Sequence, residues 1–161
     1  MNWNSKIRLD KNAWKGFFTS LKSICKETKL KEFQFKFIDR IVVTKTMNVS
    51  SVYGEKYSID HTFLHCRFAK IFINNVIDWF NAASNSEFPP TIEDKLFDII
   101  YGPYEKETLK TFQYTILFMK YFIYTSKMHN QAIYLSVFVN KVLFKVTEHS
   151  FWYLCFIRLF L

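Results

Sequence analysis

The chain has 161 residues; half are apolar, one fifth are aromatic, and phenylalanine alone contributes 19. A chain of this length and composition can bury a core that offsets the entropy of ordering, which argues against wholesale disorder. Its three glycines and three prolines are too few for a turn-rich β-sandwich or barrel, and its long apolar periodicities favour helices.

The net charge of +8 is unevenly distributed along the chain. Residues 1–45 contain eleven Lys or Arg and four Asp or Glu, a net charge of +7, whereas residues 46–161 contain eleven and ten, a net charge of +1. A basic segment joined to a near-neutral body is typical of contact with an anionic partner. A solvated lysine-rich helix face that keeps an aromatic chain in solution explains the same distribution equally well.

The cysteine content and the N-terminus point to an intracellular protein. Cys25, Cys66 and Cys155 are odd in number and widely spaced, unlike the cysteines of a secreted disulfide scaffold. The first residues, MNWNSKIRLDK, lack the apolar stretch of a signal peptide. We therefore expect the cytoplasm or nucleus rather than secretion.

Two amphipathic helices are predicted in the basic segment. The first carries an apolar stripe from Trp14 to Cys25, at the spacings of one helix face. The second begins after Thr28, and its stripe comprises Leu30, Phe33, Phe37, Ile38 and Ile41. Residues 46–57 have no helical period and predict a short irregular or hairpin insert.

Further helices are predicted in the near-neutral body. A long one runs from near Asp60 to about Ala82, with a stripe of Leu64, Phe68, Ile71, Phe72, Val76, Trp79 and Phe80. A capping box at Thr91 and Asp94 opens a short helix. Another long helix has a stripe of Leu109, Phe112, Ile116, Met119 or Lys120, and Ile123, and ends near residues 126–130. The last has a stripe of Ile133, Val137, Leu143 and Val146.

These patterns together predict an all-α fold of five or six helices around an aromatic core. Residues 151–161, FWYLCFIRLFL, are apolar except for Arg158. Eleven residues are too few to span a membrane, which needs about 20. The segment could pack in the core, lie on a membrane or be a tail created by a displaced stop codon, and membrane anchoring is the least favoured of the three.

The sequence lacks the motifs of common catalytic sites. There is no Asp-Asp pair of the kind that holds the metals of polymerases and nucleases. The phosphate-binding loop GxxxxGK[ST] and the motifs GxGxxG, GxSxG and HExxH are also missing. We therefore expect no catalytic activity.

One constellation has residue types that suit Zn²⁺. His61 and Cys66 form an H-x4-C pattern, and His65 lies four residues after His61. On a regular helix His61 and His65 would share a face, whereas Cys66 would need a distorted turn to join them. Structural zinc sites usually take four ligands. Spacing alone therefore favours ordinary helix residues over a filled zinc site.

Two blocks of the chain, KEFQFKFIDRIVVTK (31–45) and SIDHTFLHCRFAKIFINNVIDWFN (58–81), resemble the zinc-binding region downstream of reverse transcriptase in LINE-like (non-LTR) retrotransposon polyproteins. FDIIYG (97–102) and TFQYTILFMKYFIYTSKMHN (111–130) look like the helical tail of the same region. The resemblance covers roughly residues 3–146. It implies one helical domain over residues 1–146, followed by an apolar, non-native tail over residues 147–161.

The resemblance also implies that the zinc site has degenerated. The family pattern is CxxC, a short spacer and H-x4-C, and only His61 and Cys66 match it. Ser51 stands where the first cysteine is expected, and the second is missing before Gly54. The vestigial ligands are therefore His61 and Cys66, with His65 as a substitute, and we expect at most weak zinc binding and no other cofactor.

The family's tail is thought to hold template RNA, which implies a nucleic-acid-binding role for Lys29, Lys31, Lys36 and Arg40. We therefore expect a non-catalytic remnant with at most weak, non-specific binding to RNA or single-stranded DNA and no small-molecule substrate. The alternative is a helical protein-interaction or membrane-surface domain that uses the aromatic surface and the C-terminal tail. The sequence does not determine the oligomeric state.

Overall fold

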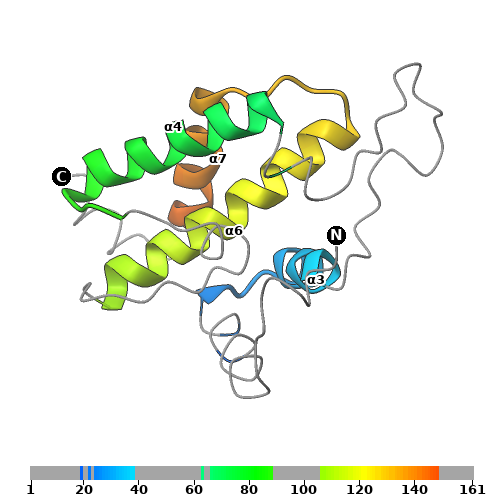
Figure 1. The fold of residues 1–161 in the computed structure, drawn as a ribbon. Coiled ribbons are helices and arrows are strands. Elements are labelled where there is room, and N and C mark those ends of the chain that lie inside the picture. Colours follow the sequence, from blue (N-terminus) through cyan, green and yellow to red (C-terminus); the bar gives the residue numbers. More distant parts are fainter. Residues whose placement is uncertain are drawn as a thin grey trace, which may run out of the picture.

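The computed structural model describes residues 19, 22, 24–38, 63, 66–88 and 106–148. They form four helices (Figure 1), namely α3 (Thr28–Ile38), α4 (Arg67–Ser84), α6 (Lys106–Met128) and α7 (Leu135–Glu148). No strand occurs among these residues, so the all-α prediction is confirmed for them. Four helices are fewer than the five or six expected. The insert at 46–57, the short helix after Thr91 and residues 149–161 lie outside the described ranges.

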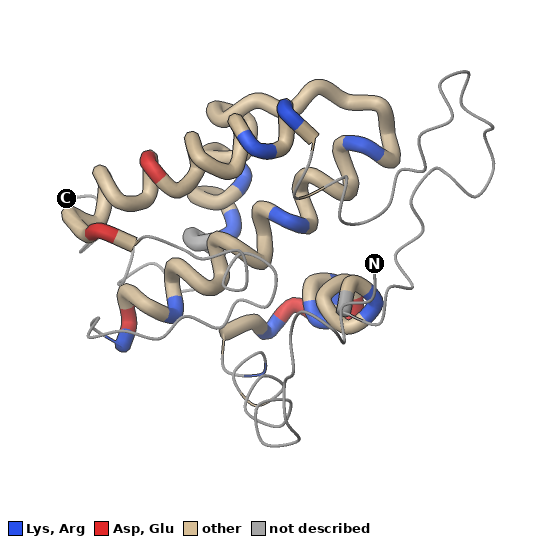
Figure 2. Tube along the Cα trace, in the orientation of Figure 1, with Lys and Arg blue, Asp and Glu red and all other residues tan. Residues whose placement is uncertain are grey.

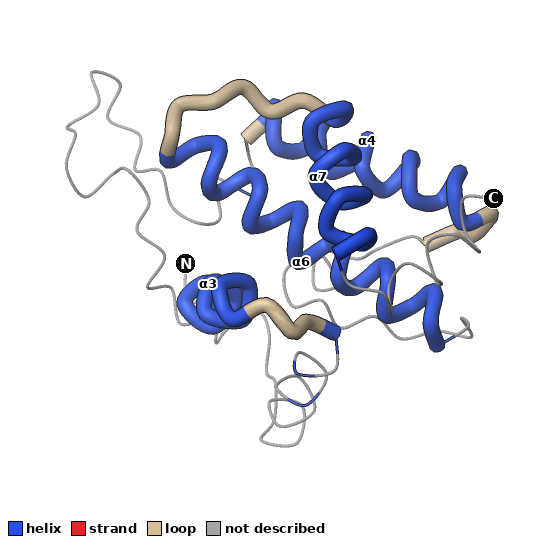
Figure 3. The backbone as a smooth tube through the Cα atoms, turned by 180° about the vertical axis from the view of Figure 1, so that it is seen from behind, coloured by secondary structure: helices blue, strands red, loops and turns tan. Residues whose placement is uncertain are grey.

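Helix α6 is the centre of the arrangement, because α3, α4 and α7 all contact it. Helix α4 runs antiparallel beside α6 (Figure 1), and α7 crosses both on the face seen in Figure 3. Helix α3 is viewed almost end-on in both figures, so its axis lies across that of α6. The core therefore lies around α6 rather than between two layers.

The burial of α6 extends around its whole circumference. All ten residues from Thr111 to Lys120 are buried. A helix covered on every side is expected in the middle of a bundle rather than on its surface. The predicted stripe is correct for Phe112, Ile116, Met119, Lys120 and Ile123, which are buried, but the buried surface extends well beyond a single stripe.

The buried threonines of α6 satisfy their hydroxyl groups within the helix. Thr111 Oγ1 donates to the carbonyl oxygen of Glu107 at 2.9 Å, and Thr115 Oγ1 donates to that of Thr111 at the same distance. Such bonds to the preceding turn remove the cost of burying a hydroxyl group that has lost its water. Threonine can therefore occupy positions at which α6 faces its neighbours.

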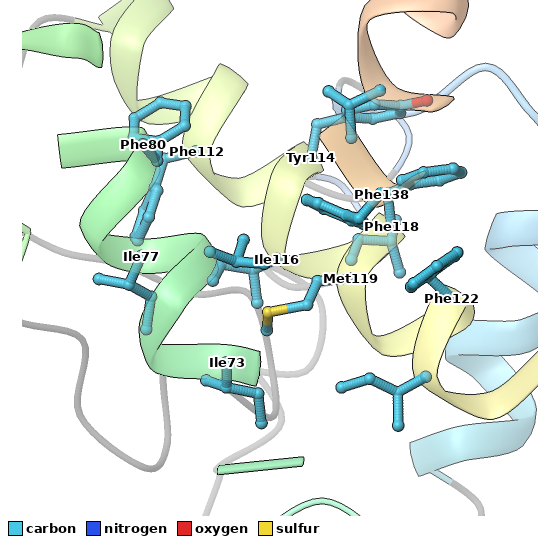
Figure 4. Close-up of a cluster of buried hydrophobic side chains, with 14 of the residues drawn as sticks. Ile73, Ile77, Phe80, Phe112, Tyr114, Ile116, Phe118, Met119, Phe122 and Phe138 are labelled. Atoms are coloured by element: carbon cyan, nitrogen blue, oxygen red, sulfur yellow. The ribbon is translucent and has the colours of Figure 1, made fainter. Parts of the chain in front are cut away.

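Phenylalanine rings join the helices into one core (Figure 4). Phe80 of α4 lies 4.9 Å, centroid to centroid, from Phe112 of α6, on which Phe88 stacks at 4.4 Å. At the other end of the core, Phe138 of α7 contacts rings of both α4 and α6, namely Phe72, Trp79, Phe118 and Phe122. The expected aromatic core is confirmed.

The end of α4 holds Phe88 in this core. Asn85 adopts the left-handed conformation, with φ 47°, that commonly terminates a helix. The side chain of Asn81 then bonds to both backbone groups of Phe88: its Nδ2 donates to the carbonyl oxygen at 3.2 Å, and its Oδ1 accepts from the N–H at 3.1 Å. The residues after the helix are thus folded back, which positions the Phe88 ring against Phe112.

The predicted start of α4 near Asp60 is wrong. Cys66 has extended backbone angles, φ −65° and ψ 119°, and is the N-cap of a helix that begins at Arg67. Phe72, Val76 and Phe80 are buried as expected, but Phe68 and Ile71 are exposed by 77% and 49%. The buried face also includes Ala69, Ile73 and Ile77, so it is rotated from the predicted stripe.

The predicted stripe of α7 is also wrong. Phe138 and Val142 are fully buried, whereas Val137 and Leu143 are exposed by 42% and 39%. Helix α7 has apolar residues on more than one face, with Phe138 and Val142 on the buried one and Phe144 on the exposed one. Periodicity alone could not distinguish the two faces, because each recurs at helical spacing.

A buried lysine ties α3 to α6. The Nζ of Lys120, a residue only 1% exposed, donates to Oε1 of the fully buried Gln34 at 2.8 Å. The same ammonium lies 5.0 Å from the centroid of the Phe37 ring. An ammonium group is costly to bury unless it is hydrogen-bonded. The two residues therefore fix which part of α3 faces which turn of α6.

We expect Gln34→Leu and Lys120→Met each to lower the free energy of unfolding by roughly 2 kcal/mol, because each leaves a buried polar group without its principal partner. The double substitution should cost less than the sum of the two. Urea unfolding of the four proteins in a double-mutant cycle measures this coupling. Strictly additive effects would contradict the pairing.

Candidate nucleic-acid interface

One face of α3 is fixed against the rest of the protein. The Phe33 ring lies 5.4 Å from that of Tyr121 and 5.3 Å from that of Tyr124, both on α6. Leu30 and Phe37 are buried on the same side. The opposite side of this short helix therefore faces outward.

A polar clamp holds the start of α3. Glu27 Oε1 accepts a hydrogen bond from the Tyr114 hydroxyl group at 2.8 Å, and Glu27 Oε2 lies 3.3 Å from Lys145 Nζ. One carboxylate thus connects the residue before α3 with α6 and α7. Because the Glu27 carboxylate is paired with Lys145, it offsets little of the positive charge of the lysines on the outer side.

Several lysines lie in α3 and just before it (Figure 2). Lys22, Lys26 and Lys29 are exposed. None of the three forms an ion pair with another residue in the described ranges. Three accessible ammonium groups within eight positions create a local positive potential that attracts phosphates.

The predicted binding residues differ in their availability. Lys29 is exposed and Lys31 is half-buried, whereas Arg40 lies outside the described residues. Lys36 is exposed but hydrogen-bonds to Glu32, and that bond raises the pKa of Lys36 and lowers that of Glu32. The carboxylate offsets part of the charge that Lys36 would offer a phosphate. The strongest cationic cluster therefore includes Lys22 and Lys26, which were not among the predicted site residues.

An exposed aromatic ring lies on the same helix as the lysines. Phe35 of α3 is 49% exposed, although its neighbours Phe33 and Phe37 are buried. Residues four apart are neighbours on a helix surface, which puts Phe35 beside Lys31. Sequence reasoning assigned most aromatic residues to the core, but the absence of Phe35 from the predicted stripe was a usable signal.

The predicted zinc ligands are only partly described. His61 and His65 lie outside the described residues, and Cys66 is half-buried at the start of α4. Among the residues that the structure does describe, no three His, Cys, Asp or Glu side chains gather as a metal-binding group. The described residues therefore supply one sulfur atom toward such a site and no complete set of ligands.

The surroundings of Cys66 favour its thiolate. Burial opposes ionisation, but the backbone N–H groups of Ala69 and Phe68 and the ammonium of Lys127 outweigh it and lower the pKa of the thiol. Helix N-termini and nearby cations commonly act on cysteine in this way. Cys25, by contrast, is buried, and its sulfur donates to the carbonyl oxygen of Glu27 at 3.6 Å.

Comparisons with family models, with curated proteins and with solved structures find no match to this chain. Within the described ranges, no helix is long and apolar enough to cross a membrane.

We expect iodoacetamide to alkylate Cys66 with a half-maximal pH below that of an unstructured cysteine peptide measured in parallel. Replacing Lys127 with Gln should move this midpoint upward, because it removes a positive charge that stabilises the thiolate. Peptide-resolved mass spectrometry of rates between pH 6 and pH 10 separates Cys66 from the other cysteines. A midpoint at or above that of the peptide would contradict the assigned environment.

Proposed function

We propose that this chain is a non-catalytic remnant of the region downstream of a retrotransposon reverse transcriptase, and that it binds single-stranded RNA or DNA weakly and without sequence preference through α3. The observation that carries the proposal is the exposure of Lys22, Lys26 and Lys29, in and just before α3, together with the half-exposed ring of Phe35 on the same helix. Lysines and aromatic rings in this combination are typical of surfaces that bind single strands.

The chemistry of the face explains why the binding would be non-specific. Lysine ammonium groups contact phosphates, which are the same for every sequence. A base of any kind can stack on a phenylalanine ring, because every base has a π-face. A face with few cations also releases few counterions, so the affinity should be modest and its decrease with salt should be shallow.

Zinc has no part in the proposed binding. The pattern that resembles the family lacks both cysteines of its first half, at Ser51 and before Gly54. The basic face is held by Gln34, Phe33 and Glu27 through contacts with α6 and α7. We therefore propose that nucleic-acid binding persists after chelation of divalent metals.

Charge reversal tests the face directly. A triple variant with Lys22, Lys26 and Lys29 changed to Glu should lose binding to fluorescein-labelled U15 RNA. A partial loss should lower the slope of log affinity against log salt by about two, since each phosphate contact contributes about 0.7. Fluorescence anisotropy measures both quantities. Titrations at about 25 to 200 mM salt cover the range in which such phosphate contacts are lost.

The matched control reverses three other exposed basic residues, Arg67, Lys70 and Lys106. This variant has the same net charge as the first, so a comparison separates the α3 face from the overall charge. The control should retain most of the binding. Equal losses in the two variants, or no binding by the parent above the lowest salt, would refute the proposal.

A second test concerns stacking. Phe35→Ala should weaken binding by about fivefold, which corresponds to about 1 kcal/mol, the lower end of what one stacked base contributes. Phe68→Ala removes a ring that is even more exposed, but on α4, and should leave the affinity unchanged. The same anisotropy titration compares the two. A larger effect from Phe68 would place the contact on another face.

A further inference from the structure

An open groove of about 550 Å³ lies between α6 and α7. Phe118 and Tyr121 of α6 contribute rings to it, and α7 lines it with Val137, Asn140, Lys141, Phe144 and Lys145. The α7 residues recur at intervals of three and four, so they follow one side of that helix. From Val137 to Lys145 the lining extends about 12 Å along the α7 axis, or two turns of a helix.

The apolar residues of α7 in this groove remain accessible. Val137 is 42% exposed and Phe144 is 64% exposed, and Tyr134, one residue before α7, is 61% exposed. The residues that pack α7 into the core, Phe138 and Val142, are fully buried. Helix α7 thus has one apolar face that holds the fold together and another that lines the groove.

The edge of the groove is positively charged. Lys141 is exposed, and its Nζ lies 5.3 Å from the centroid of the Phe122 ring. Lys145 lies one turn further along α7 and is paired with Glu27. No described acidic side chain forms an ion pair with Lys141. The groove therefore combines an apolar lining with the exposed cation Lys141, and the ion pair between Lys145 and Glu27 lies one helical turn further along.

We propose that the groove between α6 and α7 docks an amphipathic helix with apolar residues on one face and acidic residues beside them. Apolar side chains at i, i+3 or i+4, and i+7 of such a helix would match two turns of groove, as in other helix-in-groove complexes. An acidic residue next to these anchors would meet Lys141. Charge complementarity of this kind governs partner choice and association rate.

The same features disfavour three other occupants of the groove: a second copy of this chain, residues 151–161, and a membrane. A second copy of this chain would bring its own Lys141 and Lys145 against the same residues, on a chain with a net charge of +8. Residues 151–161 contain Arg158 and no acidic residue, so they offer no complement. A planar bilayer does not enter a concave surface, which argues against a membrane.

The test uses the full-length chain and a phage-displayed library of 16-residue helical peptides with randomised surface positions. Sequences enriched by the chain should share apolar residues at i, i+3 or i+4, and i+7, flanked by Asp or Glu. Synthetic copies of the best peptide, with its acidic residues either kept or changed to Lys, then serve as probes in anisotropy titrations. Only the acidic version should bind.

Substitutions place the peptide on the groove. Phe144→Asp should weaken binding by about tenfold or more, as expected for an aromatic anchor. Leu143→Asp alters the adjacent exposed residue, which does not line the groove, and should have no effect. Lys141→Glu should weaken the acidic peptide about fivefold, as for loss of a rim ion pair, and should strengthen the lysine version. Thermal unfolding followed by circular dichroism verifies that each variant is folded.

The possible outcomes are distinct. Enrichment of acidic amphipathic sequences, with the preference reversed by Lys141→Glu, supports the proposal. Enrichment of basic sequences or of none, an equal loss with Leu143→Asp, concentration-dependent self-association of the chain, or binding to phosphatidylserine vesicles instead of peptides would each overturn it. RNA that competed for the groove but not for α3 would also overturn it, because it would assign the groove to nucleic acid.

Discussion

The burial of α6 on every side is the constraint from which the other features of the described fold follow. This helix of 23 residues is rich in threonine and aromatic residues, whose intrinsic helix propensity is modest, so its stability must come mainly from the helices that cover it. The same cover excludes water from its polar side chains. The hydroxyl groups of Thr111 and Thr115 donate hydrogen bonds to carbonyl oxygens of the preceding turn. Lys120 donates to Gln34, and Tyr114 donates to Glu27. Both of these longer contacts involve α3 or the residue before it. The hydrogen bonds that the buried polar side chains of α6 need therefore restrict the position of α3 more tightly than apolar contact alone would.

This placement of α3 has a direct effect on the surface. Once Gln34 and Phe33 face α6, Lys29 and Phe35 are left on the outside. The net charge of the chain does not predict this, because lysines serve different ends: Lys120 is a buried hydrogen-bond donor, Lys145 is paired with Glu27, and Lys36 with Glu32. Only those lysines that remain accessible and without a nearby carboxylate contribute fully to an anionic contact. The candidate interface is thus a by-product of the way in which the core satisfies its own polar groups.

Sequence periodicity predicted the type of every described helix, and it predicted the start of α3 and the end of α6 within a few residues. It located buried faces less well, for a physical reason. Periodicity identifies a helix by its contrast between an apolar and a polar side, and that contrast is weak in this chain. The middle of α6, residues 111–120, is buried on every side, and α7 has both the buried Phe138 and the exposed Phe144. The sequence could not predict that Cys66 is the N-cap of α4. That role depends on the backbone conformation of Cys66, whose side chain makes no capping hydrogen bond. Of the predicted binding residues, Lys29 lies where expected, but the pairing of Lys36 with Glu32 requires both side chains to be placed.

The same contacts bear on how a chain with a degenerate zinc pattern could keep its shape. In small metal-binding domains the metal often supplies the folding free energy, and removing it unfolds the protein. The described core of this chain draws its cohesion from other sources: Phe80 and Phe88 on Phe112, Phe138 among the rings of α4 and α6, and the bond between Gln34 and Lys120. None of these contacts involves the predicted zinc ligands His61, His65 and Cys66. The segment of the predicted ligands also contributes to α3, because the ring of Phe63, between His61 and His65 in the sequence, lies 5.0 Å from that of Phe37. We therefore propose that the basic surface depends on the packing of the aromatic core and on the bond between Gln34 and Lys120 rather than on a metal.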